Sequence, residues 1–251
     1  MRVAFFATCL ADSFFAESAL AAVRVLRALG VDVVVPPGQT CCGQPAFNTG
    51  HWKEATRMAV HTARVFEEAD AIVLPSGSCA AMLRCHYREL GGAPGEAGPL
   101  GATLAGRTWE LTQFIVDVLG VTELGNGLGG RVVAWHHGCH AQRELGVHDQ
   151  PLTLLRNAGA TIAGWDAAEE CCGFGGVFAV KMPEVSVAMA DRKVETLSGR
   201  SADVLSSTDA GCLMQLSGRL RRRGLGLDVR HVADLLWQAM QGNGNRRPGA
   251  A

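Results

Sequence analysis

Short apolar runs alternate with amphipathic segments along the chain. Residues 2–8 (RVAFFAT), 31–35 (VDVVV) and 69–75 (ADAIVLP) are apolar runs of strand length, and such continuous runs are typical of buried parallel strands. Between them, residues 13–29 and 51–68 carry apolar side chains at helical spacing. This alternation of strands and helices predicts a doubly wound α/β domain.

Glycine and proline mark the breaks in this pattern. Gly30 ends the first helix as a C-cap residue does, and residues 36–50 contain the prolines and glycines of a loop. Residues 91–107, rich in Gly, Pro and Ala, predict a surface excursion. A helix over 109–119 closes the first half, and GNGLGG at 125–130 predicts a linker.

The second half of the chain repeats the first. RVVAWHHGC matches RVAFFATC, LLRNAGATIAG matches VLRALGVDVVV, and SADVLSSTDAGC matches EADAIVLPSGSC. Internal similarity of this kind predicts repeated structural units. We therefore expect two pseudo-symmetric doubly wound α/β domains with parallel sheets, at residues 1–125 and 131–241, each with one Cys-Cys-Gly motif, and a flexible tail at 242–251.

Eight of the nine cysteines follow the same repeat. In each half a lone cysteine stands 32 positions before a Cys-Cys-Gly doublet, and a further cysteine follows the doublet by 37 or 40 positions. The lone cysteine and the last one each come directly after a predicted strand, where ligands of open parallel sheets bind. The first set is Cys9, Cys41, Cys42 and Cys79, and the second set is Cys139, Cys171, Cys172 and Cys212.

Composition limits what these thiols can do. With 48% apolar and 19% charged residues the chain can bury a good core. No apolar stretch approaches the roughly 20 residues of a membrane span, the N-terminus has no signal-peptide layout, and we expect a cytoplasmic protein. Disulfides are rare in that reducing compartment, so metal or redox chemistry is the expected role of the cysteines. The net charge of −1 does not favour nucleic-acid binding.

Cysteine number alone does not choose the metal. Both iron–sulfur clusters and structural zinc use four thiolates. Zinc sites gather ligands from close C-x-x-C knuckles, whereas here single thiols come from loops far apart in sequence, together with an adjacent doublet. Glycines after the doublets allow backbone amides near the sulfurs, which tunes cluster potentials. This arrangement favours iron–sulfur clusters, with zinc left open at the N-terminal site.

The doubled cysteine pattern resembles the cysteine-rich CCG domains of heterodisulfide reductase and of the glycolate and glycerol-3-phosphate oxidase iron–sulfur subunits. The motifs CCGQPAFNTG, LPSGSCAAM, CCGFGGVFAVK and SSTDAGCLMQ are similar, over nearly the whole chain, to the lactate utilisation protein A family. That resemblance implies a non-autonomous subunit of an L-lactate dehydrogenase complex. Its partners would be a ferredoxin-like iron–sulfur subunit and a third subunit, which together oxidise L-lactate to pyruvate.

The chain departs from the heterodisulfide reductase pattern at two positions. Where that pattern has a fifth thiolate, three residues after the last cysteine of each set, this chain has Met82 and Gln215. We therefore expect a four-thiolate 4Fe–4S cluster that passes electrons, one or two per chain, in place of a cluster that cleaves disulfides. Cys85 lies about 120° around a helix from Cys79 and is expected to be a plain buried thiol.

Polar residues near the second set have several possible roles. His136 and His137 precede Cys139 and could donate to sulfur, couple proton uptake to reduction, bind metal or cap the loop. We expect His140 to be a capping residue. Lys181 could neutralise a reduced cluster or be solvated. Asp209 is expected to accept backbone hydrogen bonds in a turn.

These observations predict an iron–sulfur electron-transfer subunit of an L-lactate oxidising complex. Neither a dinucleotide fingerprint after a strand nor a P-loop occurs in the sequence, so substrate oxidation is expected on another subunit. Two alternatives remain open. One is a thiol–disulfide reductase subunit of the heterodisulfide reductase type, and the other is a zinc-stabilised scaffold without a redox role.

Overall fold

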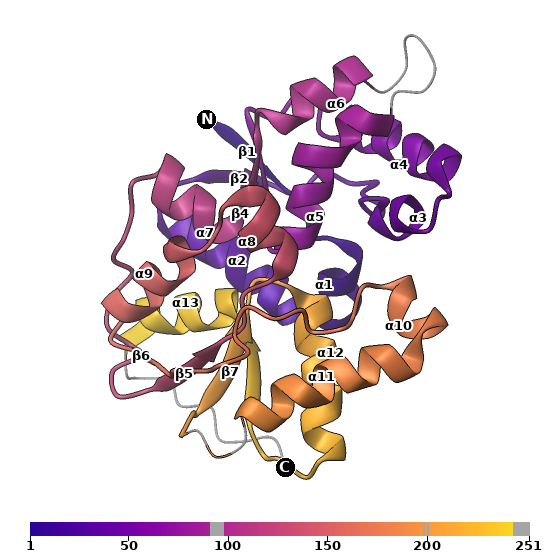
Figure 1. Cartoon of the computed structure of the whole chain (residues 1–251). Coiled ribbons are helices and arrows are strands. Elements are labelled where there is room, and N and C mark those ends of the chain that lie inside the picture. Colours follow the sequence, from indigo (N-terminus) through magenta and orange to yellow (C-terminus); the bar gives the residue numbers. More distant parts are fainter. Residues whose placement is uncertain (91–97, 198, 200, 243–251) are drawn as a thin grey trace.

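Two four-stranded parallel sheets form the centre of the molecule. The structure is a computed structural model of the 251-residue chain, and it describes residues 1–90, 98–197, 199 and 201–242. The strand orders are β2-β1-β3-β4 and β6-β5-β7-β8. Figure 1 shows the first sheet in the upper part of the molecule and the second in the lower part, each flanked by helices. The predicted α/β class with parallel sheets is confirmed.

The first half contains four strands and the helices around them. In chain order its elements are β1 (Arg2–Phe5), α1 (Cys9–Phe14), α2 (Ala16–Ala28), β2 (Asp32–Val34), α3 (Gln44–Asn48), α4 (Trp52–Val65), β3 (Ala71–Leu74), α5 (Gly77–Ala81), the π-helix η1 (Met82–His86), the 3-10 helix η2 (Tyr87–Leu90), α6 (Gly98–Ala105), β4 (Thr108–Glu110), α7 (Leu111–Gln113) and the π-helix η3 (Phe114–Val118).

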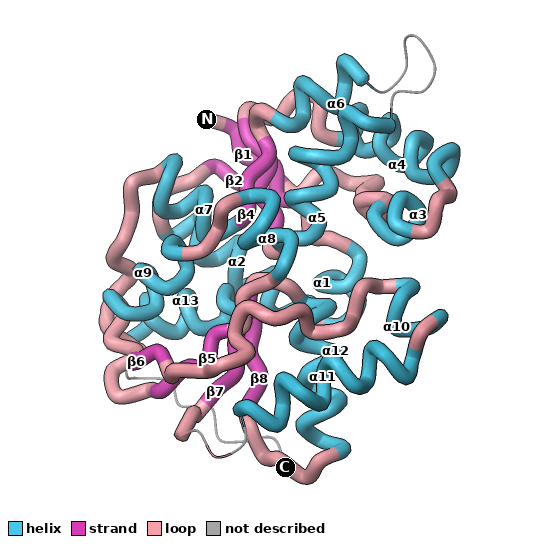
Figure 2. The backbone as a smooth tube through the Cα atoms, viewed as in Figure 1, coloured by secondary structure: helices cyan, strands magenta, loops and turns pink. Residues whose placement is uncertain are grey.

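The second half follows the same order of strands. Its elements are β5 (Val132–Trp135), α8 (Cys139–Leu145), α9 (Asp149–Asn157), β6 (Thr161–Ile162), α10 (Val177–Lys181), α11 (Pro183–Leu197), β7 (Val204–Ser207), α12 (Ala210–Arg222), β8 (Asp228–His231) and α13 (Val232–Gln241). Figure 2 shows how loops join these strands to the helices that cover them.

The repeat seen in the sequence extends to individual hydrogen bonds. The backbone N–H of Arg2, at the start of β1, donates to the carboxylate of Asp70 at 2.7 Å. The N–H of Val132, at the start of β5, donates to the carboxylate of Asp203, also at 2.7 Å. Each aspartate stands just before the central strand that pairs with the first one. The two halves are therefore built to the same local plan.

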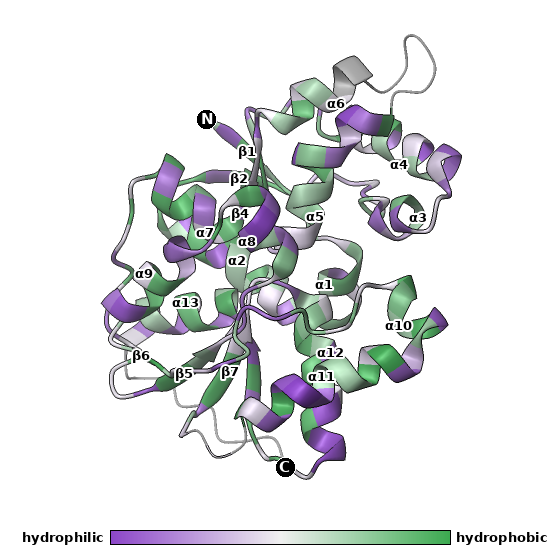
Figure 3. Cartoon of the chain, viewed as in Figure 1, coloured by the Kyte–Doolittle hydropathy of each residue, from purple (hydrophilic) through white to green (hydrophobic). Residues whose placement is uncertain are grey.

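Apolar side chains from both halves form one continuous cluster. Phe5 and Phe114 from the first half belong to the same buried group as Trp135 and Leu236 from the second. In Figure 3 the strands β5 and β7 are mostly hydrophobic, and the C-terminal end of α12 is hydrophilic. Burial of apolar surface between α2 and α13 thus stabilises the two halves against each other. The predicted domain limits at 125 and 131 remain predictions.

Several local predictions differ from the structure. The helix expected over 13–29 is two helices, α1 and α2, and the loop 36–50 contains the short helix α3. The helix expected over 109–119 begins later, because residues 108–110 pair with β3 as strand β4. The side chain of Glu110 then accepts hydrogen bonds from the N–H groups of Thr112 and Gln113. This cap sets the start of the helix at residue 111.

Two expected surface segments lie partly outside the described residues. Residues 98–105 of the predicted excursion form α6, whereas 91–97, and the tail from 243 onward, lie outside the described residues. Within the described ranges, none of the helices combines the length and the apolar character that crossing a membrane requires.

Candidate metal centres

The first four thiols lie together at the carboxyl end of the first sheet. The Sγ atoms of Cys9 and Cys41 are 3.7 Å apart, and those of Cys42 and Cys79 are 3.4 Å apart. Cys9 begins α1 directly after β1, while Cys79 lies in the first turn of α5 after β3. Thr8, the residue before Cys9, has a φ of 64°. This left-handed conformation costs a residue with a side chain about 1–3 kcal/mol.

The second four thiols form a matching group at the other sheet. The Sγ atoms of Cys172 and Cys212 are 3.0 Å apart, and the thiols of Cys139 and Cys172 both hydrogen-bond to Cys171. All nine cysteines of the chain are free thiols. The structure therefore brings together the members of each predicted set, in two separate places.

Protons within each set are shared unequally. The pKa of Cys41 lies well below its usual value because Cys42 and Cys9 donate hydrogen bonds to its sulfur. Cys171 has a lowered pKa for the same reason, with Cys139 as the stronger donor and Cys172 as the next. The first cysteine of each doublet is thus the one most readily ionised, and thiolates are the form that binds metal.

Backbone amides point at the sulfurs of both doublets. The N–H of Gly43 lies 3.5 Å from Cys41 Sγ, and the N–H of Gly173 lies 3.4 Å from Cys171 Sγ. Both glycines have positive φ, of 85° and 80°, which is the conformation that glycine adopts without strain. At Gly173 a Cβ atom would lie 2.5 Å from the carbonyl oxygen of Ser186. The amides expected from the glycine-rich sequence are therefore present.

The two sets differ in exposure. Cys9 is exposed, and it lines an open pocket of about 330 Å³ together with Cys41 and the loop residues before it. In both sets the second cysteine of the doublet, Cys42 or Cys172, is buried. Each set thus has a buried side against the core, and the first also has a side open to solvent.

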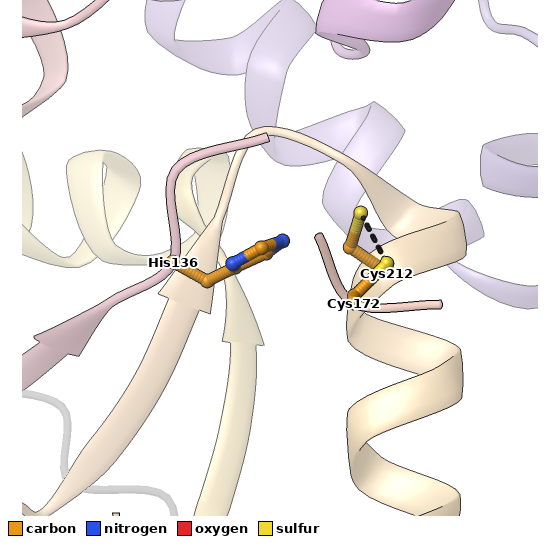
Figure 4. A group of neighbouring side chains, drawn as sticks. All are labelled: His136, Cys172 and Cys212. Atoms are coloured by element: carbon orange, nitrogen blue, oxygen red, sulfur yellow. Dashed lines mark hydrogen bonds between the residues drawn. The ribbon is translucent and has the colours of Figure 1, made fainter. Parts of the chain in front are cut away.

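A buried histidine distinguishes the second set. His136 is fully buried at the end of β5, and burial lowers its pKa to about 3, so the ring is neutral. Its Nδ1 lies 3.3 Å from the carbonyl oxygen of Ala168, while its Nε2 is buried without a hydrogen-bond partner among the described residues. Figure 4 shows the ring directed toward the sulfurs of Cys172 and Cys212.

The other two histidines of this loop face different neighbours. His140 Nδ1 lies 2.6 Å from the carboxylate of Glu144, one helical turn away, so it pairs within α8. The ring of His137 stacks on that of His148, with 4.4 Å between centroids. Ligand atoms of His137, His148 and Glu169 lie within 4.8 Å of one another, a group that belongs to neither set of thiols.

The structure also shows a buried lysine that the sequence analysis did not single out. Lys193 of α11 is fully buried, and its ammonium donates to the carbonyl oxygens of Ala167 and Glu170, the latter at 2.7 Å. Burial lowers its pKa to about 8, while the nearby thiols of the second set favour its charged form. The sequence did contain a signal for this residue, because Lys193 falls within the apolar stripe of an amphipathic helix. Lys181, which was singled out, is exposed.

The residues in place of a fifth thiolate have structural roles. Met82 is fully buried in the core of the first half. Gln215 donates to the hydroxyl of Ser186 at 2.9 Å, and that hydroxyl donates to the carbonyl of Gly173 at 2.6 Å. Gln215 thus braces the loop of the second doublet. Cys85 is partly buried, with its thiol 3.8 Å from the carbonyl of Glu144.

Comparison with known proteins agrees with this geometry. The family model of the cysteine-rich domain, CCG, matches the chain twice, over residues 3–84 and 133–217, and each match includes one complete set of cysteines. Lactate utilization protein A of Geobacillus sp. (strain WCH70) is 46% identical over 237 residues, which cover 94% of this chain and 99% of the relative. This chain belongs to the lactate utilization protein A family.

Other members of the lactate utilization protein A family align over the same length. The protein of that name from Anoxybacillus flavithermus (strain DSM 21510 / WK1) is 44% identical, with 94% of this chain and 99% of the relative covered. Among solved structures, glutamate racemase from Francisella tularensis subsp. tularensis SCHU S4 is 12% identical, with a TM-score of 0.30 over 96% of this chain and 78% of the racemase. This similarity is too low to support any conclusion about the chain.

Proposed function

We propose that this chain is the iron–sulfur electron-transfer subunit of a complex that oxidises L-lactate to pyruvate. One observation carries the proposal: each half gathers four thiols at the carboxyl end of a parallel sheet. Four thiolates are the usual shell of an iron–sulfur cluster. The names of its relatives supply the lactate system.

The donor set fits such a cluster. Cys139, Cys171, Cys172 and Cys212 would hold one cluster, and Cys9, Cys41, Cys42 and Cys79 a second cluster or a zinc ion. A bound 4Fe–4S cluster supplies reversible one-electron chemistry. The amides of Gly43 and Gly173 donate toward sulfur, and the ammonium of Lys193 lies near the second set. Both features favour added negative charge on the sulfurs.

The hypothesis of a zinc-stabilised scaffold explains the residues around the second set of thiols less well than the iron–sulfur hypothesis does. A structural zinc ion has no redox chemistry, so its charge would never change. A fully buried ammonium costs free energy to desolvate, and Lys193 is placed where thiolates favour its charged form. Such a cation is useful beside a centre whose negative charge increases on reduction. This supports a redox centre at the second set.

Electrons would reach and leave the chain through partner proteins. We propose a ferredoxin-like iron–sulfur subunit and a third subunit as these partners, because the sequence contains neither a dinucleotide fingerprint nor a P-loop. Oxidation of lactate releases two electrons and two protons, and it would take place on another subunit. The exposed Cys9 beside its open pocket is a suitable point of electron exchange.

Lactate-dependent reduction tests the proposal. The anaerobically purified chain is mixed with its two partner subunits, and electron paramagnetic resonance spectra are recorded before and after L-lactate is added. We expect signals of reduced clusters in this chain with L-lactate, and none with D-lactate or without the partners. Clusters that dithionite reduces but L-lactate with the partners does not would contradict the proposed role.

A further inference from the structure

The position of His136 in the second half corresponds to an apolar residue in the first half. His136 and Phe6 each stand three positions before the first cysteine of their set. Phe6 is 1% exposed and packs against Phe66, with 5.0 Å between ring centroids. His136 is 0% exposed, so a polar ring occupies a buried position that the other half fills with hydrocarbon. Burying a polar group without a partner costs free energy. We therefore expect an interaction that offsets this cost at His136.

Hydrogen bonds identify which nitrogen of His136 is free. A carbonyl oxygen only accepts, so the contact from Nδ1 to Ala168 O at 3.3 Å places the ring proton on Nδ1. Nε2 therefore carries a lone pair, and it is buried with no partner among the described residues. Metal-binding histidines are oriented in the same way, with one nitrogen bound to a carbonyl and the other to the metal.

The free nitrogen faces two thiols. One ligand atom each from His136, Cys172 and Cys212 lie within 4.8 Å of one another, and the outer edge of the imidazole points toward both sulfurs (Figure 4). Neither thiol donates a hydrogen bond to this nitrogen, whereas a metal ion between the three atoms would accept its lone pair together with the two sulfurs as thiolates. The backbone on both sides is held, because His136 N–H donates to Ser206 O at 2.8 Å, and Lys193 also reaches the Ala168 carbonyl.

We propose that His136 Nε2 is a direct metal ligand of the second centre, beside Cys172 and Cys212. The inference rests on the proposal that this set of thiols holds a metal centre. No proton is released from the ring, because Nδ1 keeps its hydrogen while Nε2 donates its lone pair. Ligand identity tunes the potential of iron–sulfur centres, and in Rieske centres histidine ligands in place of cysteine raise it. The two centres of this chain would then differ in potential, since Phe6 supplies no donor at the first.

Nitrogen hyperfine coupling tests this ligand. The full chain is prepared with isotopically labelled histidine, with Cys41→Ser and Cys42→Ser removing the first centre, and it is reconstituted with iron and sulfide. We expect pulsed electron paramagnetic resonance to detect a strongly coupled histidine nitrogen, and the coupling to disappear in His136→Phe, which copies the first half. His136→Gln is the second variant, in case the phenylalanine disturbs folding, and it too should lose the coupling. The control is His148→Gln, which removes the ring that stacks on His137. This variant should keep the nitrogen coupling.

The outcomes separate this ligand from the proposed function. A reconstituted cluster without histidine coupling overturns the ligand and leaves the electron-transfer proposal standing. If no iron–sulfur cluster assembles, the electron-transfer proposal fails, and cobalt(II) bound to the same chain decides the ligand. A cobalt(II) spectrum that changes from mixed nitrogen and sulfur to pure sulfur coordination in His136→Phe supports it. An identical spectrum in both proteins overturns it.

Discussion

The carboxylate of Asp209 accepts two hydrogen bonds from Ser78, at 3.0 Å from the backbone N–H and 2.8 Å from the hydroxyl. Asp209 lies three residues before Cys212 of the second set, and Ser78 lies directly before Cys79 of the first. Ser78 lies beside Cys79 in α5, and Asp209 is the N-cap residue of α12, the helix that carries Cys212. The two candidate centres are therefore joined across the halves by one buried carboxylate.

Replacing this carboxylate should weaken both the fold and the opposite centre. We expect Asp209→Asn to lower the free energy of unfolding by about 2 kcal/mol, because the amide oxygen is a weaker acceptor than a carboxylate oxygen and the amide NH₂ is placed in a buried site that held a carboxylate. Metal retained by the first set should also fall, although the substitution is in the second half. Denaturant unfolding and metal analysis measure the two effects. Asp70→Asn, an exposed aspartate that also accepts a backbone N–H, should cost about 1 kcal/mol or less. Equal losses of unfolding free energy in the two variants would contradict a stabilising link between the halves through Asp209.

Glu110 should make the stability of the protein depend on pH. It is fully buried, and desolvation raises its pKa from 4.5 to about 7. Between these values the folded state binds more protons than the unfolded state, so the contribution to stability is complete below pH 4.5 and is lost as the pH rises through 7. The loss is about 3 kcal/mol. In Glu110→Gln this decrease should be absent from unfolding curves measured at pH 5 and pH 8. Parallel behaviour of the two proteins would show that Glu110 does not titrate in this range.

Lys193 should control the potential of the second centre. We expect Lys193→Met to lower its reduction potential, because the substitution removes a buried positive charge near the thiols of that set. A redox titration followed by electron paramagnetic resonance measures the shift. Lys181→Met is the matched control, since Lys181 is an exposed lysine that follows the same doublet, and its potential should equal that of the wild type. An unchanged potential in Lys193→Met would rule out this electrostatic role.

The glycine of the second doublet should tolerate no side chain. Gly173 has a φ of 80°, and an added Cβ would lie 2.5 Å from Ser186 O. Gly173→Ala should therefore cost about 2 kcal/mol or more in unfolding free energy and reduce metal binding at the second set. Gly164 has open space around it and no positive φ, so Gly164→Ala should change stability by about 0.5 kcal/mol or less. Thermal unfolding and metal analysis of the two variants provide the comparison.

Sequence periodicity predicted the features that depend on local pattern. Apolar runs before Cys9, Cys79 and Cys139 indicated strands that end shortly before these thiols, and each of these cysteines follows a strand of a parallel sheet. The repeat spacing predicted which thiols would meet. Strand β4 was missed because it has only three residues, and its end depends on the capping side chain of Glu110.

Contacts between distant segments were beyond what periodicity can predict. Asp209 was expected to accept backbone hydrogen bonds, and it does so from Ser78, 131 positions away. Lys193 lies in an apolar stripe, but its role depends on carbonyl groups of a loop more than 20 positions earlier. His136 was recognised as a candidate, yet only the fold shows which nitrogen is free. Such pairings are set by tertiary packing, which no short sequence window contains.

Metal and sulfide analysis of three proteins tests the central claim most directly. The wild type, Cys41→Ser with Cys42→Ser, and Cys171→Ser with Cys172→Ser are purified without oxygen, and iron, acid-labile sulfide and zinc are measured per chain. The account predicts about four or about eight iron atoms per wild-type chain with matching sulfide, and loss of one complete cluster when the second doublet is replaced. Zinc without sulfide in the wild type, or iron unaffected by either pair of substitutions, would contradict it.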